Sequence, residues 1–258
     1  MAKLNKKIMV GLIMGTLLFG GSLDANDKFE AFQKKEYKGL LNYRIYTPEN
    51  MDHQKKYPLI IYFHGAGSRG NDNTRHLTHG AGELLAYSRE SGNPAIIIAP
   101  QCPKDKRWVN IPWKIPECTM PKEPSSPMKL AIELLQDTIS KLPVDKERIY
   151  VTGLSMGGFA TWDIVARMPG TFAAAMPICG GGDAKMAAVM KNVPIWIFHG
   201  GADKTVATKY SQDMAAALKK VGGKVKYTEY EGVGHDSWTR TYTNKEVLKW
   251  LFNQKKDK

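Results

Sequence analysis

The stretch Ile149-Tyr150-Val151-Thr152-Gly153-Leu154-Ser155-Met156-Gly157-Gly158 decides the fold, because a short apolar run turns abruptly into a helix through Gly-x-Ser-x-Gly. A serine at the tip of such a turn takes a strained backbone conformation, and the flanking positions must be nearly free of side chain. Gly153 and Gly157 meet that need. The turn also puts Ser155 at a helix N-terminus, where backbone N–H groups stabilise negative charge. The pattern predicts that Ser155 is a nucleophile, although the motif alone also occurs in ordinary turns.

Strand and helix patterns alternate on both sides of this turn. Residues 41–47 alternate apolar and polar side chains and predict an antiparallel edge strand. Further strands are predicted at 57–63, 95–99, 172–179, 193–198 and 224–230, and helices at 79–90, 128–142, 156–167, 208–221 and 244–253. This alternation predicts one α/β domain with a mainly parallel sheet and helices on both faces.

The composition fits a single globular domain with a basic surface. The chain has 258 residues, 43% of them hydrophobic, and a formal net charge of +12. Its Lys and Arg residues are scattered, and no basic stretch is interleaved with aromatic residues, so nucleic acid is not expected as a partner. The charge is expected to lie on a solvated surface, where it would attract anionic material only weakly.

The N-terminus is typical of an export signal. Three lysines among the first seven residues precede an apolar run over residues 8–19, and small residues follow. We expect a signal peptide at 1–25, a mature domain at 27–258 and a secreted or periplasmic protein. The run is short for a membrane span, which needs about 20 apolar residues, so stable membrane insertion is not expected and an uncleaved anchor is the alternative.

The three cysteines invite one disulfide in an exported protein. Cys102 and Cys118 lie 16 positions apart in one irregular segment and form the expected pair. Cys179 ends an apolar run and is expected to be a buried, small hydrophobic residue.

Residues 100–127 hold seven of the 14 prolines and predict a long irregular loop. Loops of this length in a compact domain are usually functional, and this one leaves the carboxyl end of a predicted parallel strand. We expect it at the rim of the substrate-binding site, with an exposed spacer as the alternative. Trp108, in this loop, and Trp238 are candidate substrate-binding residues, with packing as an equal alternative.

A serine nucleophile needs a base that takes its proton and a carboxylate that orients the base. Where this turn is catalytic, the acid and the histidine follow the serine in that order, on loops at strand ends. Asp203 and His235 each follow a predicted strand in that order. We predict a triad of Ser155, His235 and Asp203, with Asp183 as the alternative acid.

The oxyanion that forms when serine attacks an ester needs two preorganised donors. One is expected to be the backbone N–H of Met156, directly after the nucleophile. The other is expected in the Gly-rich loop after the strand at 57–63, where Ala66 is the first choice and Gly67 the second.

The remaining histidines do not indicate a metal site. His64 and His199 end predicted strands and are expected to pack beneath their loops. His53, His76 and His79 have no carboxylate or cysteine at metal-ligand spacing. We therefore expect neither a metal nor another cofactor.

Five segments together resemble one group of α/β-hydrolases: 63–73 (FHGAGSRGNDN), 99–103 (APQCP), 153–158 (GLSMGG) with Trp162, 177–183 (PICGGGD) and 235–238 (HDSW). This is the carboxylesterase and predicted-peptidase group, which is similar to dienelactone-hydrolase-like and feruloyl-esterase-like proteins. The match spans about residues 41–255. The chain departs from true dienelactone hydrolases, which use a cysteine nucleophile, so that chemistry is not expected.

The resemblance implies an exported serine esterase that acts on small acyl or phenolic esters, including those that decorate plant polysaccharides. It implies the same triad of Ser155, Asp203 and His235. A serine peptidase of the prolyl-oligopeptidase-like type is the alternative enzyme, and an inactive carbohydrate-binding protein is the alternative from another class. The acyl group, the alcohol and the oligomeric state are not predicted, because loops set specificity and the fold does not.

Overall fold

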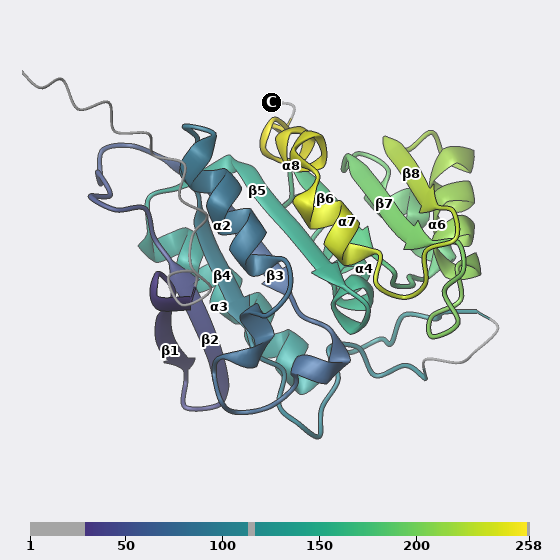
Figure 1. Cartoon of the computed structure of the whole chain (residues 1–258), viewed down its shortest axis with the longest axis horizontal. Helices are drawn as coiled ribbons and strands as arrows, with labels where there is room; N and C mark the ends of the chain where they lie inside the picture. Colours follow the sequence, from purple (N-terminus) through teal and green to yellow (C-terminus); the bar gives the residue numbers. More distant parts are fainter. Residues whose placement is uncertain (1–28, 113–116, 257–258) are drawn as a thin grey trace, which may run out of the picture.

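The computed structural model describes residues 29–112 and 117–256, so the predicted signal peptide at 1–25 lies outside the described residues. Figure 1 shows one twisted sheet flanked by helices. Its eight strands are β1 (Gln33–Tyr37), β2 (Leu41–Tyr46), β3 (Tyr57–Phe63), β4 (Ile96–Pro100), β5 (Val144–Leu154), β6 (Ala174–Ile178), β7 (Ile195–Gly200) and β8 (Val225–Tyr230). The α/β fold class predicted from the sequence is confirmed.

The strands are arranged in the order β1-β2-β4-β3-β5-β6-β7-β8. The pairs from β4 to β8 are all parallel, whereas β2 is antiparallel to both β1 and β4. The expectation that β2 is an edge strand is therefore wrong. The edge on this side is β1, whose sequence Gln-Lys-Lys-Glu-Tyr is exposed over its first four residues and carries no apolar alternation that could have revealed it.

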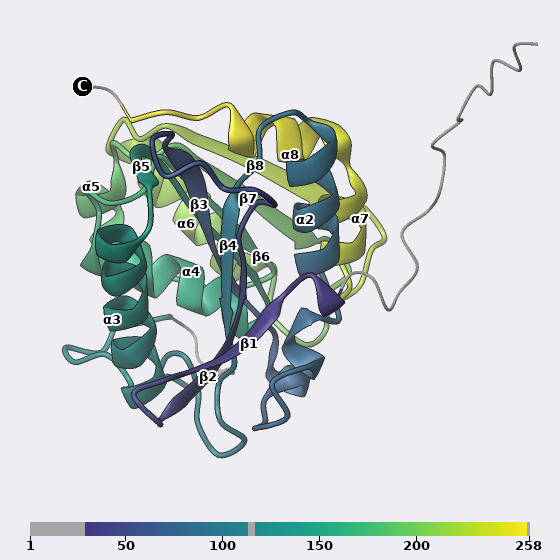
Figure 2. The same ribbon diagram turned by 90° about the vertical axis from the view of Figure 1, so that its left-hand side faces the viewer.

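Helices cover both faces of the sheet, as Figure 2 shows edge-on. One face carries α3 (Ser126–Lys141), α4 (Met156–Arg167), α5 (Ala187–Met190) and α6 (Lys209–Lys220). The other face carries α2 (Ala81–Glu90), α7 (Trp238–Thr243) and α8 (Lys245–Phe252). Three short 3₁₀ helices, η1 (Ala66–Ser68), η2 (Arg75–Leu77) and η3 (Ala184–Met186), lie in the connections.

The central strand β3 explains the two-sided core. Leu59, Ile61 and Phe63 belong to the apolar cluster that contains the α3, α4 and α6 side chains. Ile60 and Tyr62 belong to the cluster under α2, α7 and α8. Successive side chains of a strand point to opposite faces, so only a continuously apolar strand fills both layers.

The Pro-rich loop does not form the rim of the pocket described below. Within the predicted loop at 100–127, residues 101–112 and 117–125 contain neither helix nor strand, whereas Pro100 ends β4 and residues 126–127 begin α3. None of them lines that pocket, however, so the expectation of a substrate-binding rim is wrong for the described residues. Trp108, Val109 and Ile111 instead join the core on the α3 side, because their apolar surface is covered there.

The expected disulfide between Cys102 and Cys118 is not formed, and both residues are buried free thiols. Cys102 follows β4, whereas the Cys118 sulfur packs over Gly181, just beyond β6. Two strands, β3 and β5, separate β4 from β6. Neighbouring strands lie about 4.8 Å apart, so β4 and β6 are separated by three spacings, about 14 Å. A disulfide needs its two Cα atoms within about 7 Å of each other.

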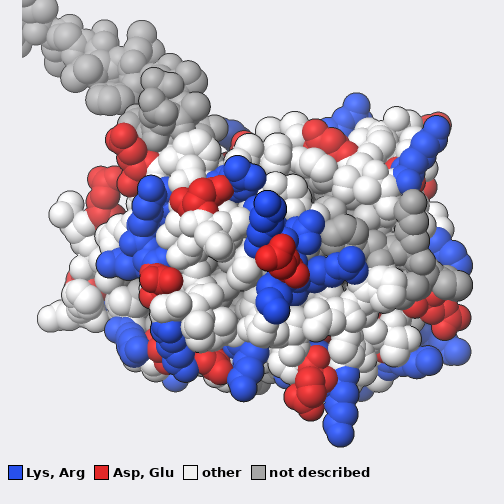
Figure 3. Space-filling view, turned by 90° about the horizontal axis from the view of Figure 1, so that it is seen from below, with Lys and Arg blue, Asp and Glu red and all other residues white. Residues whose placement is uncertain are grey.

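The surface carries both signs of charge. Over the face drawn in Figure 3, Lys and Arg side chains lie among Asp and Glu side chains and do not form one continuous basic tract. Ion pairs such as Lys38–Glu133 and Lys245–Glu90, both at 2.8 Å, connect different elements of the surface. Within the described ranges, no helix is both long and apolar enough to cross a lipid bilayer.

Candidate active site

The turn at Ser155 joins β5 directly to α4. Ser155 has φ +52°, a conformation that non-glycine residues rarely adopt. Its backbone N–H donates to the carbonyl of Ile178 at 2.9 Å, and its carbonyl accepts from the N–H groups of Gly158 and Phe159. These bonds hold the strained turn in place and aim the serine side chain away from the sheet.

Gly157 makes this turn possible through close backbone approach. A Cβ atom there would lie 2.0 Å from the carbonyl oxygen of Phe63, at the end of β3. A Cβ at Gly153 would lie 2.4 Å from the carbonyl oxygen of Gly157. The two positions must therefore lack side chains, as the sequence pattern indicates.

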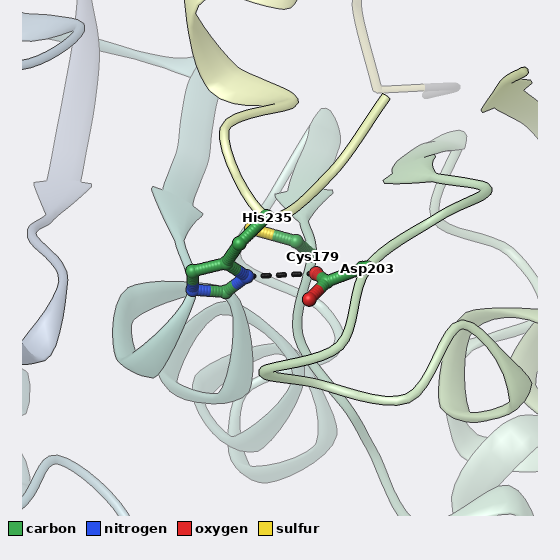
Figure 4. Close-up of side chains that lie close together, drawn as sticks. All are labelled: Cys179, Asp203 and His235. Carbon is green, nitrogen blue, oxygen red and sulfur yellow. Dashed lines mark hydrogen bonds and ion pairs between the residues drawn. The ribbon is translucent and has the colours of Figure 1, made fainter. Parts of the chain in front are cut away.

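The structure brings together the three side chains predicted to form a triad. The Nε2 atom of His235 lies 2.9 Å from the Oγ atom of Ser155. The Nδ1 atom of His235 lies 2.7 Å from an Asp203 carboxylate oxygen, the contact drawn as a dashed line in Figure 4. Asp203 follows β7 and His235 follows β8, so both reach the serine from carboxyl ends of parallel strands.

The surroundings of Asp203 keep it ionised. Burial raises its pKa, but hydrogen bonds from His235 and from the backbone N–H groups of Val206 and Thr205 outweigh this, and the net pKa lies below the usual value. Those two N–H groups donate to Oδ1 at 3.0 and 2.8 Å. The ionised carboxylate fixes the proton of His235 on Nδ1, which leaves Nε2 free to accept a proton from Ser155.

The alternative acid, Asp183, lies elsewhere. Its carboxylate accepts the backbone N–H of Met120 at 2.9 Å and caps η3 through the N–H of Lys185 at 2.9 Å. Both carboxylate oxygens are thus used in holding loops. The structure favours Asp203 as the partner of His235.

The predicted oxyanion donors surround Ser155. Met156 is the first residue of α4, and no hydrogen bond within the described residues uses its backbone N–H or that of Ala66. The first N–H groups of a helix lack intrahelical partners and can bind an anion. Ala66 and Gly67 both line the same pocket as Ser155. These N–H groups are therefore available to a developing oxyanion.

Two side chains lock the loop that carries Ala66. The Nδ1 atom of His64 lies 2.7 Å from the carbonyl oxygen of Gly65, and its Nε2 accepts the backbone N–H of Cys102 at 2.9 Å. The Nε–H of Arg69 donates to the carbonyl of Ala66 at 3.0 Å. In a trans peptide, the N–H points away from the carbonyl, so fixing a carbonyl also fixes the direction of the following N–H.

A pocket of about 640 Å³ opens above Ser155. Its apolar side chains are Ala66, Leu154, Met156, Phe159, Val206 and Trp238. Its polar side chains, besides Ser155 and His235, are Ser68, Arg75, Thr78, His79 and Thr205. The volume and the mainly apolar lining are typical of sites for small organic molecules.

The two tryptophan candidates differ in outcome. Trp238 lines the pocket, with its ring edge-on to His235 at 5.2 Å. Trp108 is fully buried, packs edge-on against Phe63 at 5.0 Å and donates its Nε1–H to the carbonyl of His64 at 3.3 Å. The expectation that Trp108 binds substrate is wrong, because its ring is enclosed by the core.

Sequence reasoning missed several pocket residues. Thr78, His79 and Phe159 line the pocket, but their helical or polar surroundings in the sequence carry no pattern that marks such a role. Val206 likewise follows Asp203 in a loop with no distinctive motif. Only the fold shows that these positions face Ser155.

One group of potential metal ligands occurs among the described residues. The ligand atoms of Cys179, Asp203 and His235 lie within 4.8 Å of one another. Figure 4 shows these three side chains close together. The carboxylate and the imidazole already bond each other. Burial raises the pKa of the Cys179 thiol to about 12, which disfavours the thiolate that a metal would need. The geometry is that of a hydrogen-bonded pair beside a protonated thiol.

The parallel sheet, the strained serine turn and the hydrogen-bonded Ser-His-Asp arrangement define an α/β-hydrolase. Residues 49–246 match the phospholipase/carboxylesterase family. The chain belongs to this family of carboxylic ester hydrolases.

Solved structures agree with this assignment. A thermostable esterase is 35% identical, with a TM-score of 0.80 over 89% of this chain and 64% of that one, so our chain spans just under two thirds of its length. A ferulic acid esterase is 16% identical, with a TM-score of 0.65 over 86% and 96% of the two chains. A dipeptidyl aminopeptidase IV-like protein from Bacteroides ovatus is 17% identical, with a TM-score of 0.62 over 87% and 35%. The last two likenesses show the fold alone. A search of curated proteins found no match.

Proposed function

We propose that this protein is an exported serine carboxylesterase that hydrolyses small acyl or phenolic esters. The observation that carries the proposal is the continuous hydrogen-bonded path from Ser155 through His235 to Asp203, on the floor of a mainly apolar pocket. Membership of an ester-hydrolase family supports the reaction class. Export rests on the sequence of residues 1–25 alone.

The reaction proceeds in two halves. Ser155 Oγ attacks the ester carbonyl while His235 Nε2 takes the hydroxyl proton, and the carbonyl oxygen becomes an oxyanion. The N–H groups of Met156 and Ala66 stabilise that charge. His235 then gives its proton to the leaving alcohol, which departs and leaves an acyl-enzyme. Water, deprotonated by His235, attacks the acyl group, and the carboxylic acid leaves as Ser155 regains its proton.

The pocket supports a small ester as substrate. About 640 Å³ accommodates a short or aromatic acyl group, and Phe159 and Trp238 offer aromatic surface to it. Thr78 and His79 at the polar side supply groups that can hydrogen-bond the hydroxyls of an alcohol or a sugar. An ester-decorated carbohydrate therefore fits as the larger substrate.

The test compares wild type with Ser155→Ala on p-nitrophenyl acetate and on methyl ferulate, with peptide amides assayed beside them. The substitution should lower kcat on the order of 10⁶-fold, because it removes the hydroxyl that is hydrogen-bonded to His235. Amide cleavage without ester turnover would identify a serine peptidase instead. A folded wild-type protein that cleaves neither class would favour an inactive carbohydrate-binding protein and overturn the proposal.

A further inference from the structure

The buried histidine at the end of β7 has a role that packing alone does not require. His199 is fully buried, and its ring lies between the loop that carries Asp203 and helix α6. Its Nε2 atom lies 3.0 Å from the carbonyl oxygen of Val206 and 3.2 Å from Oδ2 of Asp203. Its Nδ1 atom lies 2.7 Å from Oγ of Ser211.

These contacts define the proton positions on the ring. Both neighbours of Nε2 are oxygens that can only accept, so Nε2 carries a proton, which it donates to the carbonyl of Val206 with Oδ2 of Asp203 alongside at 3.2 Å. Burial lowers the pKa of His199, so the ring is neutral and Nδ1 is an acceptor. The hydroxyl of Ser211 can therefore donate to Nδ1, which fixes the tautomer from the side of α6.

Asp203 consequently lies between two imidazoles. Its Oδ2 atom accepts the Nδ1–H of His235 at 2.7 Å on one side, and on the other side it lies 3.2 Å from Nε2 of His199, whose hydrogen bond goes to the adjacent carbonyl of Val206. Its Oδ1 atom is held by two backbone N–H groups, those of Thr205 and Val206. The carboxylate side chain is completely enclosed, so water cannot replace any of these donors.

We propose that His199 is a positioning residue for the acid of the triad: it holds Oδ2 of Asp203 where it can orient His235. The inference rests on the proposed function, because it assigns His199 a part in the reaction of Ser155. A side chain of similar size without an N–H would fill the space but would remove the polar hydrogen from beside Oδ2 and release the carbonyl of Val206. Oδ1 would stay fixed by its two backbone N–H groups, but Oδ2 would be held by His235 alone, so the carboxylate would tilt and the ring of His235 would tilt with it.

The experiment compares two variants that fill the same buried site, His199→Gln and His199→Leu. The glutamine amide can place an N–H near the position of Nε2, whereas leucine cannot donate. We expect His199→Leu to lower kcat by roughly 10–100-fold with little change in KM, the size of effect that follows loss of an outer-shell partner or a small misplacement of a catalytic group. We expect His199→Gln to recover most of this loss.

A third variant guards against misfolding. Ser211→Ala removes the hydroxyl that faces Nδ1 of His199 and that also lies 3.3 Å from the carbonyl of Gly180, and it replaces a small buried side chain with a smaller one. We expect it to fold and to lose a few-fold in kcat, by analogy with other outer-shell changes. The concentration of active sites in each preparation is measured by fluorophosphonate titration.

Two readouts separate positioning from packing. The acid limb of the plot of kcat/KM against pH should move to higher pH in His199→Leu. Without the imidazole of His199 beside it, the Asp203 carboxylate interacts more strongly with His235 and stabilises its protonated form. The groups that face Asp203 and His199 are His235, the Cys179 thiol and Glu229 of β8, and none of them is altered. The low-field proton resonance of the His235–Asp203 hydrogen bond should shift or broaden in the leucine variant and persist in the glutamine variant.

Equal losses in the leucine and glutamine variants, with an unmoved acid limb and an unchanged low-field resonance, would show that His199 only packs and would overturn the proposal. The resonance does not depend on turnover. If the wild type has no esterase activity, the proposed function fails, while the resonance still reports whether His199 positions Asp203.

Discussion

Replacing Gly157 by alanine should displace the serine turn as a whole. The added Cβ would lie 2.0 Å from the carbonyl oxygen and 2.5 Å from the carbonyl carbon of Phe63, both backbone atoms of β3. Unstrained contacts of this kind begin above about 3 Å, so the start of α4 must move away from β3 by roughly 1 Å. A displacement of that size costs about 10²-fold in rate when it affects a catalytic group, and overpacking costs about 1–3 kcal/mol in stability.

The assay measures kcat on p-nitrophenyl acetate, the rate of fluorophosphonate labelling and the melting temperature. Gly170→Ala is the matched control, because a Cβ there has no atom within 4 Å. We expect Gly157→Ala to lose about 10²-fold in kcat and in labelling rate, and Gly170→Ala to keep both. If the two variants behaved alike, the close approach of β3 to the turn would not position Ser155.

Four further outcomes are expected. Asp203→Asn should lower kcat by about 10⁴-fold in steady-state assays with folding intact, because an amide stabilises the wrong tautomer of His235. Arg69→Met should lower kcat by about tenfold without raising KM, because the carbonyl of Ala66 keeps only the Arg69 backbone N–H as a donor and the following N–H, that of Gly67, is less firmly aimed at the oxyanion. Arg89→Met removes an exposed ion pair with Glu49 and should match wild type in the same assay. Burial raises the pKa of Asp72, but hydrogen bonds from the Arg75 N–H, Gln101 and the Thr74 N–H outweigh this and lower the pKa from an ordinary 3.8 to about 2. The contribution of Asp72 to stability is therefore present above pH 3.8 and lost as the pH falls through about 2. When the melting temperature is measured against pH, Asp72→Asn should show a smaller decline over this window than wild type. A reducing agent should leave the melting temperature unchanged, since Cys102 and Cys118 are free thiols; a fall on reduction would contradict the structure.

Periodicity located most of the fold because burial on both faces leaves a continuous apolar signal, as in β3. The strand β1 gave no such signal, since its charged side chains face solvent and only its backbone pairs with β2. The Pro-rich loop was recognised as irregular, but the sequence could not show that Trp108 turns inward. The local sequence around an aromatic residue in a loop does not differ between a residue that binds a ligand and one that completes a core.

The candidate site was predictable where the chemistry fixes spacing and order. Ser155 follows β5, Asp203 follows β7 and His235 follows β8, and few other arrangements produce this chain order at strand ends. The partners of Asp203 were not predictable to the same extent. His199 was expected only to pack, because its bonds to Val206 and Ser211 depend on how the loop folds back over β7.

The most direct test of the central claim is to label the protein with a fluorophosphonate and to map the modified residue by mass spectrometry. The account predicts one phosphonyl group per chain, on Ser155. It also predicts that ester hydrolysis by the wild type falls in proportion to the fraction of chains labelled. Stoichiometric labelling of another residue, or full ester hydrolysis by the Ser155→Ala variant, would contradict it.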